Sequence, residues 1–227
     1  MKGGGGTYRA VIFDLDGTLL DTLDDLTNAV NTTLTALGLP GRTRDEVRSF
    51  VGDGVAKLME RAMPVGFDPQ SAADGLARFK AYYADHCREK TAPYEGIPSL
   101  LADLQKMGLH TGIVSNKFDG AVKALSKHYF GDLIEVAVGE RESEGIRKKP
   151  APDTLLMAMG SLGVSPQETL YVGDADTDIM TARGAGVACA SVTWGFRDRE
   201  FLLSHGATML IDRPDELKSL LSIEEKI

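Results

Sequence analysis

The fold is indicated by one stretch near the start of the chain, Ala10-Val11-Ile12-Phe13-Asp14-Leu15-Asp16-Gly17-Thr18. Its first four residues are apolar without interruption, as expected for a strand buried on both faces of a parallel sheet. Two carboxylates spaced by one residue, Asp14 and Asp16, follow directly, and Gly17 allows the chain to turn. Ligands of open α/β sheets bind beyond the carboxyl ends of the strands, so this acidic turn is a candidate site. The alternative is a solvated turn, since aspartate and glycine are ordinary turn formers.

The composition is that of an ordinary globular chain. With 227 residues, 43% hydrophobic and 26% charged, it can form one large α/β domain or a medium domain with an insertion. A formal net charge of −8 argues against nucleic acid or an anionic membrane as a partner. It also means that a phosphate site would need a local cation.

Cysteine usage and hydropathy indicate a cytoplasmic protein. Only two cysteines occur, Cys87 and Cys189, which excludes a disulfide scaffold. No apolar run approaches the length of about 20 residues that a membrane span needs. The start, Met1-Lys2 and four glycines, lacks the apolar region of a signal peptide and is expected to be a tail.

Residues 20–92 are predicted to form a helical insertion. The spacing of apolar residues predicts helical stretches at residues 23–37, 55–62 and 76–87. Thr43 and Glu46 form the pattern of a capping box, which indicates a further helix start. No strand pattern appears between Leu20 and Thr91, and such a segment is far too long for a crossover loop. We therefore expect a separate small domain at 20–92 and a core domain made of residues 1–19 and 93–227.

From Gly96 onward, helical and strand patterns alternate. Strands are predicted at residues 111–114, 134–138, 169–172, 187–192 and 209–211, and helices at residues 100–107, 121–128, 152–162, 179–185 and 217–221. Repeated βα units require a mostly parallel sheet with helices on both faces. The expected fold is therefore α/β, a Rossmann-like parallel core with an inserted all-helical domain.

Chemically useful side chains follow three of these strands and precede one helix. They are Asp14, Asp16, Ser115, Asn116, Lys149, Asp174 and Asp178. Parallel strands share one carboxyl edge, so these groups can converge there. Carboxylates without cysteine or histidine nearby suit Mg²⁺ rather than zinc, while a hydroxyl, backbone amides and a lysine suit a phosphate. One carboxylate can attack phosphorus, and its neighbour can protonate the leaving oxygen.

The order of these motifs resembles the haloacid-dehalogenase superfamily of phosphatases, from about Val11 to Leu221. The first motif is matched by residues 14–18, the second by Ser115, the third by Lys149 with Pro150, and the fourth by Gly173-Asp174 with Asp178. The resemblance implies that the helical insertion is the small mobile cap of this superfamily. It also implies a small phosphate ester as substrate and Mg²⁺ as cofactor.

The resemblance implies a role for each matched position. Asp14 would be the nucleophile and a Mg²⁺ ligand, and Asp16 the general acid and base, with its backbone carbonyl on the metal. Asp174 would be the third protein ligand. The remaining positions divide into a phosphate clamp, made of Ser115, the amide of Asn116 and Lys149, and supporting residues, Asp178 and Thr18. Asp176 is expected to be a plain helix cap or a surface residue, and Lys148 a solvated charge.

Residues 52–62 resemble the cap of phosphoglycolate phosphatases. Gly52 and Gly54 precede a predicted helix whose free amides can bind an anion, and Lys57 lies one turn along. These residues are candidates for reading the leaving group of 2-phosphoglycolate; a simple turn with a solvated Lys57 is the alternative. Pyrophosphate, nucleoside monophosphates and sugar phosphates stay open as substrates. The oligomeric state, monomer or dimer, is open too.

Four other classes of protein fit less well. A phospho-acceptor receiver domain would be about half as long and would carry its acceptor where Ser115 stands. Asp16 excludes a halide-displacing dehalogenase, which lacks an acid at that position. A sugar-phosphate mutase of the superfamily carries an early histidine in the first cap helix, where residues 23–28 have none. No G-x-x-x-x-G-K-[ST] pattern supports a P-loop enzyme.

Overall fold

The computed structural model describes residues 8–221. The glycine-rich start that is expected to be a tail lies outside the described residues. Among residues 8–221, no helix combines the length and hydropathy needed to cross a membrane.

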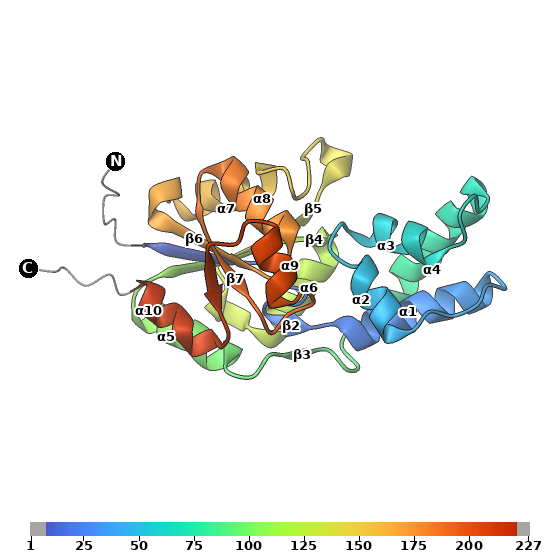
Figure 1. Cartoon of the computed structure of the whole chain (residues 1–227), viewed down its shortest axis with the longest axis horizontal. Helices are drawn as coiled ribbons and strands as arrows, with labels where there is room; N and C mark the ends of the chain where they lie inside the picture. The colour runs from blue at the N-terminus through green and yellow to red at the C-terminus, as the bar shows by residue number, and fades with distance from the viewer. Residues whose placement is uncertain (1–7, 222–227) are drawn as a thin grey trace, which may run out of the picture.

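A six-stranded parallel sheet forms the centre of the molecule (Figure 1). Its strand order is β5-β4-β1-β6-β7-β8. The strands are β1 Ala10–Phe13, β4 His110–Phe118, β5 Val136–Glu140, β6 Thr169–Gly173, β7 Ala188–Val192 and β8 Met209–Ile211. β1 pairs with β4 on one side and β6 on the other, and all four of its residues are buried. This central position explains the uninterrupted apolar run, because both faces of β1 are covered.

Helices cover both faces of the sheet (Figure 1). Ile12 packs with residues of α7 (Asp153–Leu162) and α8 (Asp176–Ala185). Val11 and Phe13 point to the opposite face, where they pack with α5 (Ile97–Lys106), α6 (Asp119–Tyr129) and α10 (Leu217–Leu221). Successive side chains of a strand alternate between faces, so one short strand supplies both cores. Short 3₁₀ helices occur at Gly131–Leu133, Glu142–Glu144, Pro166–Glu168 and Pro214–Glu216.

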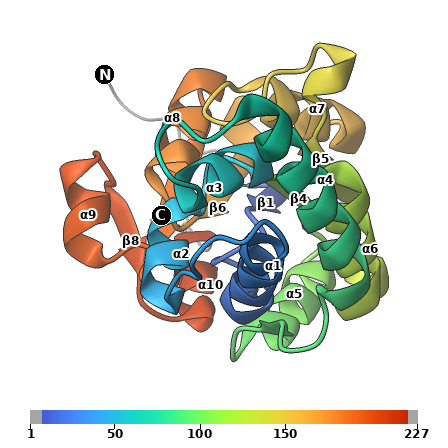
Figure 2. The same cartoon turned by 90° about the vertical axis from the view of Figure 1, so that its right-hand side faces the viewer.

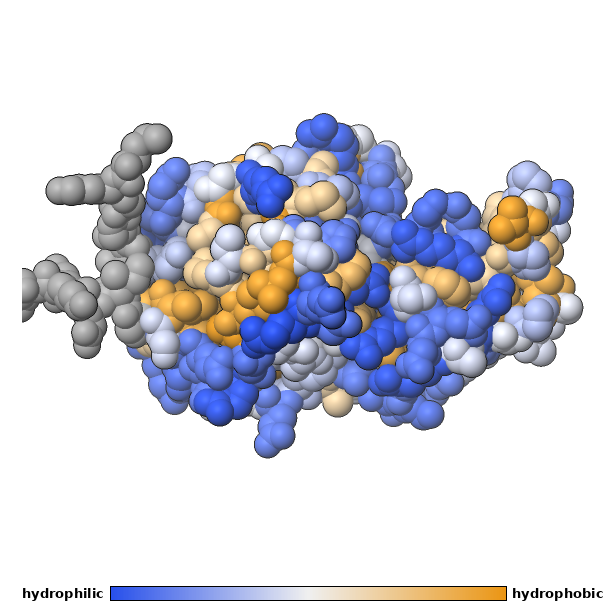
Figure 3. Space-filling model, in the orientation of Figure 1, coloured by the Kyte–Doolittle hydropathy of each residue, from blue (hydrophilic) through white to orange (hydrophobic). Residues whose placement is uncertain are grey.

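The helical insertion lies beyond the carboxyl ends of the strands. It contains α1 Leu23–Ala36, α2 Arg44–Phe50, α3 Val55–Ala62 and α4 Pro69–His86. Figure 2 shows these helices in front of β1, and Figure 3 shows that the surface is indented where the insertion meets the sheet core. Buried residues of the four helices, such as Leu26, Leu58 and Phe79, pack into one hydrophobic core.

The predicted fold class is confirmed, with local differences. β2 (Leu20–Asp21) and β3 (Ala92–Pro93) pair antiparallel, although the sequence showed no strand in this region. Two residues are too few to display a strand period. β4 extends to Phe118, past its predicted end at residue 114. A helix absent from the prediction, α9 (Arg199–Ser204), begins after Asp198, which accepts a hydrogen bond from the Phe201 amide.

Candidate active site

One pocket brings together most of the predicted site residues. It lies at the carboxyl ends of β1, β4 and β6 and is closed over by the segment before α3. The predicted residues that line it are Asp14, Asp16, Ser115, Asn116, Lys149, Asp174, Gly52 and Gly54. The enclosed space is about 40 Å³. This volume holds only a few water molecules.

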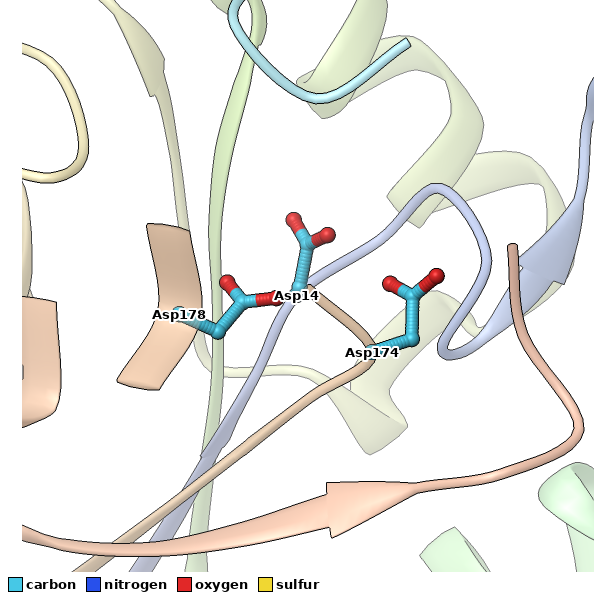
Figure 4. Close-up of side chains that lie close together, drawn as sticks. All are labelled: Asp14, Asp174 and Asp178. Atoms are coloured by element: carbon cyan, nitrogen blue, oxygen red, sulfur yellow. The ribbon is translucent and has the colours of Figure 1, made fainter. Parts of the chain in front are cut away.

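Three buried carboxylates gather at one side of the pocket (Figure 4). Asp14 follows β1, Asp174 follows β6, and Asp178 lies in the first turn of α8. One oxygen of each lies within 4.8 Å of one oxygen of the others. Gly17, at a φ of +86°, faces Asp174 so closely that a Cβ at this position would overlap the carboxylate. The glycine after Asp16 therefore allows the two acidic loops to meet.

The three carboxylates of the cluster carry more negative charge than Lys149 can neutralise. Burial raises the pKa of Asp14 to about 7, and Asp178 adds to the rise while Lys149 opposes it. Burial, reinforced by Asp14 and Asp178, raises the pKa of Asp174 to about 8. Oδ1 of Asp14 is buried and has no aligned hydrogen-bond donor, although Lys149 Nζ lies 2.8 Å away as an ion pair. Clustered hard oxygen atoms with an unsatisfied lone pair fit a cation such as Mg²⁺.

Lys149 lies between two of these acids. Its Nζ is 2.7 Å from Asp178 Oδ1 and 3.2 Å from the Tyr171 hydroxyl. Burial alone would lower the pKa of Lys149, but Asp14 and Asp178 hold it well above its usual value, so the lysine is charged. The other oxygen of Asp178 accepts a hydrogen bond from the Ala175 amide. Both Asp178 oxygens are thus engaged in holding Lys149 and the loop, behind the pocket wall.

Asp174 is held by two neighbours from other segments. Thr18 Oγ1 donates to Asp174 Oδ1 at 3.1 Å, and the Phe196 amide donates to Oδ2 at 2.7 Å. Trp194 Nε1 in turn donates to the Thr18 carbonyl at 3.0 Å. Thr18 therefore touches the acid cluster from behind, and the segment after β7 fixes the orientation of Asp174.

Asp16 is turned toward a buried lysine that the sequence analysis missed. Lys117 Nζ lies 2.8 and 2.9 Å from the two Asp16 oxygens, and Thr22 Oγ1 donates to Oδ1 at 2.7 Å. Lys117 Nζ also lies 4.6 Å from the centre of the Tyr83 ring, on α4. Burial alone would lower the pKa of Lys117, but Asp16 outweighs it and raises the pKa above its usual value. The signal in the sequence that could have identified Lys117 as a site residue is its position directly after Ser115-Asn116.

Ser115 and Asn116 sit on the extension of β4. Ser115 is buried, and its hydroxyl accepts a hydrogen bond from the Lys117 amide at 3.3 Å. Asn116 Nδ2 donates to the carbonyls of Gly52 at 2.9 Å and Lys149 at 3.0 Å. The Asn116 side chain therefore joins the helical insertion to the core.

The predicted residues around α3 are only partly brought together. Gly54 has a φ of +87°, and a Cβ there would lie 3.1 Å from the Asn116 carbonyl, so the insertion approaches the core closely. Lys57 is exposed, pairs with Glu60 at 2.7 Å and does not line the pocket. Lys148, expected to be a solvated charge, pairs with Glu142 at 2.8 Å and reaches within 3.9 Å of the Cβ position at Gly54. Arg197, which the sequence analysis did not single out, lines the pocket.

Comparisons with known proteins find relatives that match most of this chain. The chain is 34% identical over 222 residues to an N-acetylmuramic acid 6-phosphate phosphatase of Pseudomonas aeruginosa, covering 94% of both chains. It is 34% identical over 220 residues to a phosphoglycolate phosphatase of Pseudomonas putida, covering 94% of this chain and 78% of the relative. A crystal structure from Lactobacillus delbrueckii, of a protein proposed to be a phosphoglycolate phosphatase, superimposes with a TM-score of 0.89 at 35% identity. The superposition covers 96% of this chain and 100% of the Lactobacillus chain.

The family follows from a match over most of the chain. Residues 11–192 match the family described as haloacid dehalogenase-like hydrolase. This range contains every matched motif position, from Asp14 to Asp178. The chain therefore belongs to the haloacid dehalogenase-like hydrolases, as the order of its motifs predicts.

Proposed function

We propose that this protein is a Mg²⁺-dependent phosphomonoester hydrolase that acts through an aspartyl phosphate on Asp14. The observation that carries the proposal is the Asp14 carboxylate, buried at the end of the central strand, with its Oδ1 in an ion pair with charged Lys149. Ser115 and Asn116 line the same small pocket. The relatives whose names describe phosphatases support the reaction class.

The reaction would take two steps at phosphorus. In the first, an Asp14 oxygen attacks phosphorus, the ester P–O bond breaks, and the leaving oxygen takes a proton from Asp16. In the second, water attacks phosphorus and gives its proton to Asp16, and the bond to Asp14 breaks to release inorganic phosphate. Lys149 and Ser115 would hold the phosphate oxygens. Lys117 Nζ, 2.8 and 2.9 Å from the two Asp16 oxygens, would hold this carboxyl group in position.

The acid cluster would hold the cofactor. Asp14, Asp174 and the backbone carbonyl of Asp16 are the proposed ligands of Mg²⁺. When bound, Mg²⁺ supplies positive charge that neutralises the clustered carboxylates and the substrate phosphate. Thr18 and the Phe196 amide orient Asp174, and Asp178 orients Lys149.

We further propose that residues 20–92 act as a cap domain on a core of residues 1–19 and 93–227. The Asn116 to Gly52 hydrogen bond and the close approach of Gly54 hold the insertion against the core. With the insertion in this position the space in the pocket is about 40 Å³, and further closure would exclude water from the reaction. The insertion would have to move away to admit a leaving group.

The expected cytoplasmic location stays a prediction.

The proposed substrate is a small phosphate ester that carries a carboxylate, with 2-phosphoglycolate as the first choice. The small enclosed volume favours a compact leaving group. A second candidate is a phosphorylated sugar acid, because the relative that matches over 94% of both chains is named for N-acetylmuramic acid 6-phosphate. Glycolate and muramic acid both carry a carboxylate, so the protein would have to bind a carboxylate in either substrate.

A panel of phosphate esters tests the proposed function. We expect phosphate release only with Mg²⁺ present, and a kcat/KM for 2-phosphoglycolate about 10-fold or more above that for ethyl phosphate or a nucleoside monophosphate. The panel includes N-acetylmuramic acid 6-phosphate, pyrophosphate and a hexose phosphate, each assayed with Mg²⁺ and with EDTA. Turnover that persists in EDTA would contradict the metal requirement. A preference for pyrophosphate or a nucleotide would contradict the substrate.

The effect of Mg²⁺ on thermal stability should grow with pH. Asp14 and Asp174 have folded-state pKa values of about 7 and about 8, above the value of 3.8 for a free aspartate. The stability that their protons provide is therefore full below that lower value and is lost as the pH rises through 7 and 8. We expect EDTA-treated protein to lose at least about 3 °C in Tm between about pH 6 and pH 8.5, and Mg²⁺ to restore it.

Scanning fluorimetry with EDTA or Mg²⁺ at both pH values measures this difference. Asp174→Asn should reduce both the pH-dependent loss and the Mg²⁺ effect, whereas Asp176→Asn, two residues along and outside the pocket lining, should keep both. An Mg²⁺ effect of the same size in Asp174→Asn would show that the ion binds elsewhere.

A further inference from the structure

Arg197 is a core residue whose guanidinium is held by the helical insertion. Nη1 donates to the Arg48 carbonyl at 3.0 Å, and Nη2 donates to the carbonyls of Ser49 at 3.3 Å and Val51 at 2.8 Å. These carbonyls lie at the carboxyl end of α2, where backbone acceptors lack partners within the helix. The Phe201 ring lies 5.4 Å from Arg197 Cζ. The guanidinium is thus fixed in place by neutral groups.

One donor of this guanidinium, the Nε–H group, is buried without a partner. Burying an N–H donor without an acceptor is costly, so this unpaired donor indicates that an acceptor is missing beside Arg197. An arginine in a protein stays protonated, so the charge of Arg197 is permanent.

The charge of Arg197 also lacks an acidic partner. Three cations line the pocket: Lys117 pairs with Asp16, and Lys149 pairs with Asp14 and Asp178. Within residues 8–221, no carboxylate forms an ion pair with Arg197. It is therefore the pocket cation that can attract an anionic group of the substrate other than the phosphate.

The position of Arg197 suits the leaving-group side of the pocket. Its neighbour Phe196 donates to Asp174, and its own Nη2 lies 3.9 Å from the Cβ position at Gly52. Gly54, which precedes α3, offers no side-chain hydrogen bond to the first turn of that helix, and Val55 lines the pocket. The amino end of α3 adds partial positive charge to the same wall. A group extending from the phosphate toward the insertion would pass between these features.

We propose that Arg197 is the specificity-determining residue that binds a carboxylate on the leaving group with its guanidinium. The proposal rests on the proposed function, which places the phosphate at Asp14. An N–H bond from a guanidinium to a carboxylate is charge-assisted and stronger than a bond to a neutral oxygen. The residue that distinguishes carboxylated esters then lies in the core loop after β7, with the insertion serving to hold its guanidinium.

The test compares 2-phosphoglycolate with its carboxamide, which has nearly the same shape and no charge. Arg197→Met should lower kcat/KM for 2-phosphoglycolate by about 10- to 100-fold, mainly through KM, and change kcat/KM for the amide by less than about 3-fold. Arg197→Lys keeps the charge and should recover part of the preference. Equal losses on both esters in Arg197→Met would overturn the proposal.

Arg48→Met is the matched control for loss of contacts between insertion and core. Arg48 donates to the carbonyls of Phe196 at 2.7 Å and Gly195 at 3.1 Å, the reverse of the bonds that Arg197 makes, and it does not line the pocket. If Arg197 acted only by holding the insertion, both variants would show the same ratio between the two esters. We expect Arg48→Met to affect the two esters alike.

A binding measurement separates this proposal from the proposed function. In the Asp14→Asn background, calorimetry should show 2-phosphoglycolate binding tighter than inorganic phosphate, and Arg197→Met should remove that difference. If 2-phosphoglycolate binds no tighter than inorganic phosphate, the carboxylate site is wrong. Tight binding through Arg197 in a wild-type protein that hydrolyses no ester would support the site and overturn the proposed function.

Discussion

Replacing Asp14 with asparagine should lower kcat for phosphate-ester hydrolysis by at least about 10⁴-fold, because an amide oxygen is too weak a nucleophile to attack phosphorus. The substitution also removes one of the charges proposed to bind Mg²⁺. The fold should be kept, since asparagine fills the same space beside Lys149, which still has Asp178 as a partner at 2.7 Å. Phosphate release under saturating ester, together with Tm, measures both effects.

Two further measurements make the Asp14 result specific. Asp176→Asn is the same chemical change at a residue outside the pocket lining and should leave kcat within about 3-fold of the wild type. Mass spectrometry of acid-quenched wild-type enzyme should show a phosphorylated peptide containing Asp14, and the variant should not. Substantial turnover in Asp14→Asn would rule out the covalent mechanism.

Asp16→Asn should lower kcat for an alkyl phosphate by about 10²- to 10⁴-fold, the range expected when a general acid and base is lost. The asparagine is chosen because Asp16 pairs with buried Lys117, and an alanine would leave that cation without any acceptor. An aryl phosphate has a good leaving group that needs little protonation. Its first step should therefore slow much less than that of the alkyl ester.

Rapid-quench kinetics separate the two steps of this variant. With the aryl phosphate, we expect a burst of released phenol followed by a slow steady state, because water attack on the aspartyl phosphate also needs Asp16. Thr22→Val removes the 2.7 Å hydrogen bond to Asp16 without removing the acid, and it should slow both esters alike and by less than about 10-fold. Equal losses on aryl and alkyl esters in the first step of Asp16→Asn would contradict the general-acid role.

The sequence predicts the parallel core well because its signals are local. Ala10–Phe13 is an apolar run followed by acids, Ser115 follows the apolar part of β4, and β6 ends in Gly173 directly before Asp174. Parallel strands bring such ends together whatever the loops do, so the gathering of Asp14, Ser115 and Asp174 in one pocket follows from topology. Helix starts with capping patterns are equally local: Thr43 and Glu46 make the expected reciprocal bonds.

The missed features depend on contacts between distant segments. Lys117 looks like a solvated lysine until α4 brings Tyr83 over it and β1 brings Asp16 beside it. Arg197 lies in a polar loop, and its importance appears only when the end of α2 folds against it. The expectation for Lys57 drew on its place on a helix, but the helix face that carries it points to Glu60 and solvent. The position of Lys117 directly after Ser115-Asn116 is a local signal that it lies near the site, but a single sequence does not show which side chains pair with one another.

The two-stranded ribbon of β2 and β3 has a consequence for the size of the insertion that it carries. Leu20 pairs with Pro93 and Asp21 with Ala92, so the 70 residues numbered 22–91 leave and return at adjacent backbone positions. For the pairing of β2 with β3, these residues are equivalent to the loop of a hairpin. The entropic free-energy cost of closing a loop rises only with the logarithm of the loop length, by about 0.6 kcal/mol for each doubling. Inserted segments of different size can therefore be accommodated at this ribbon at little entropic cost, while the strands that precede Asp14 and Asp174 keep their pairing.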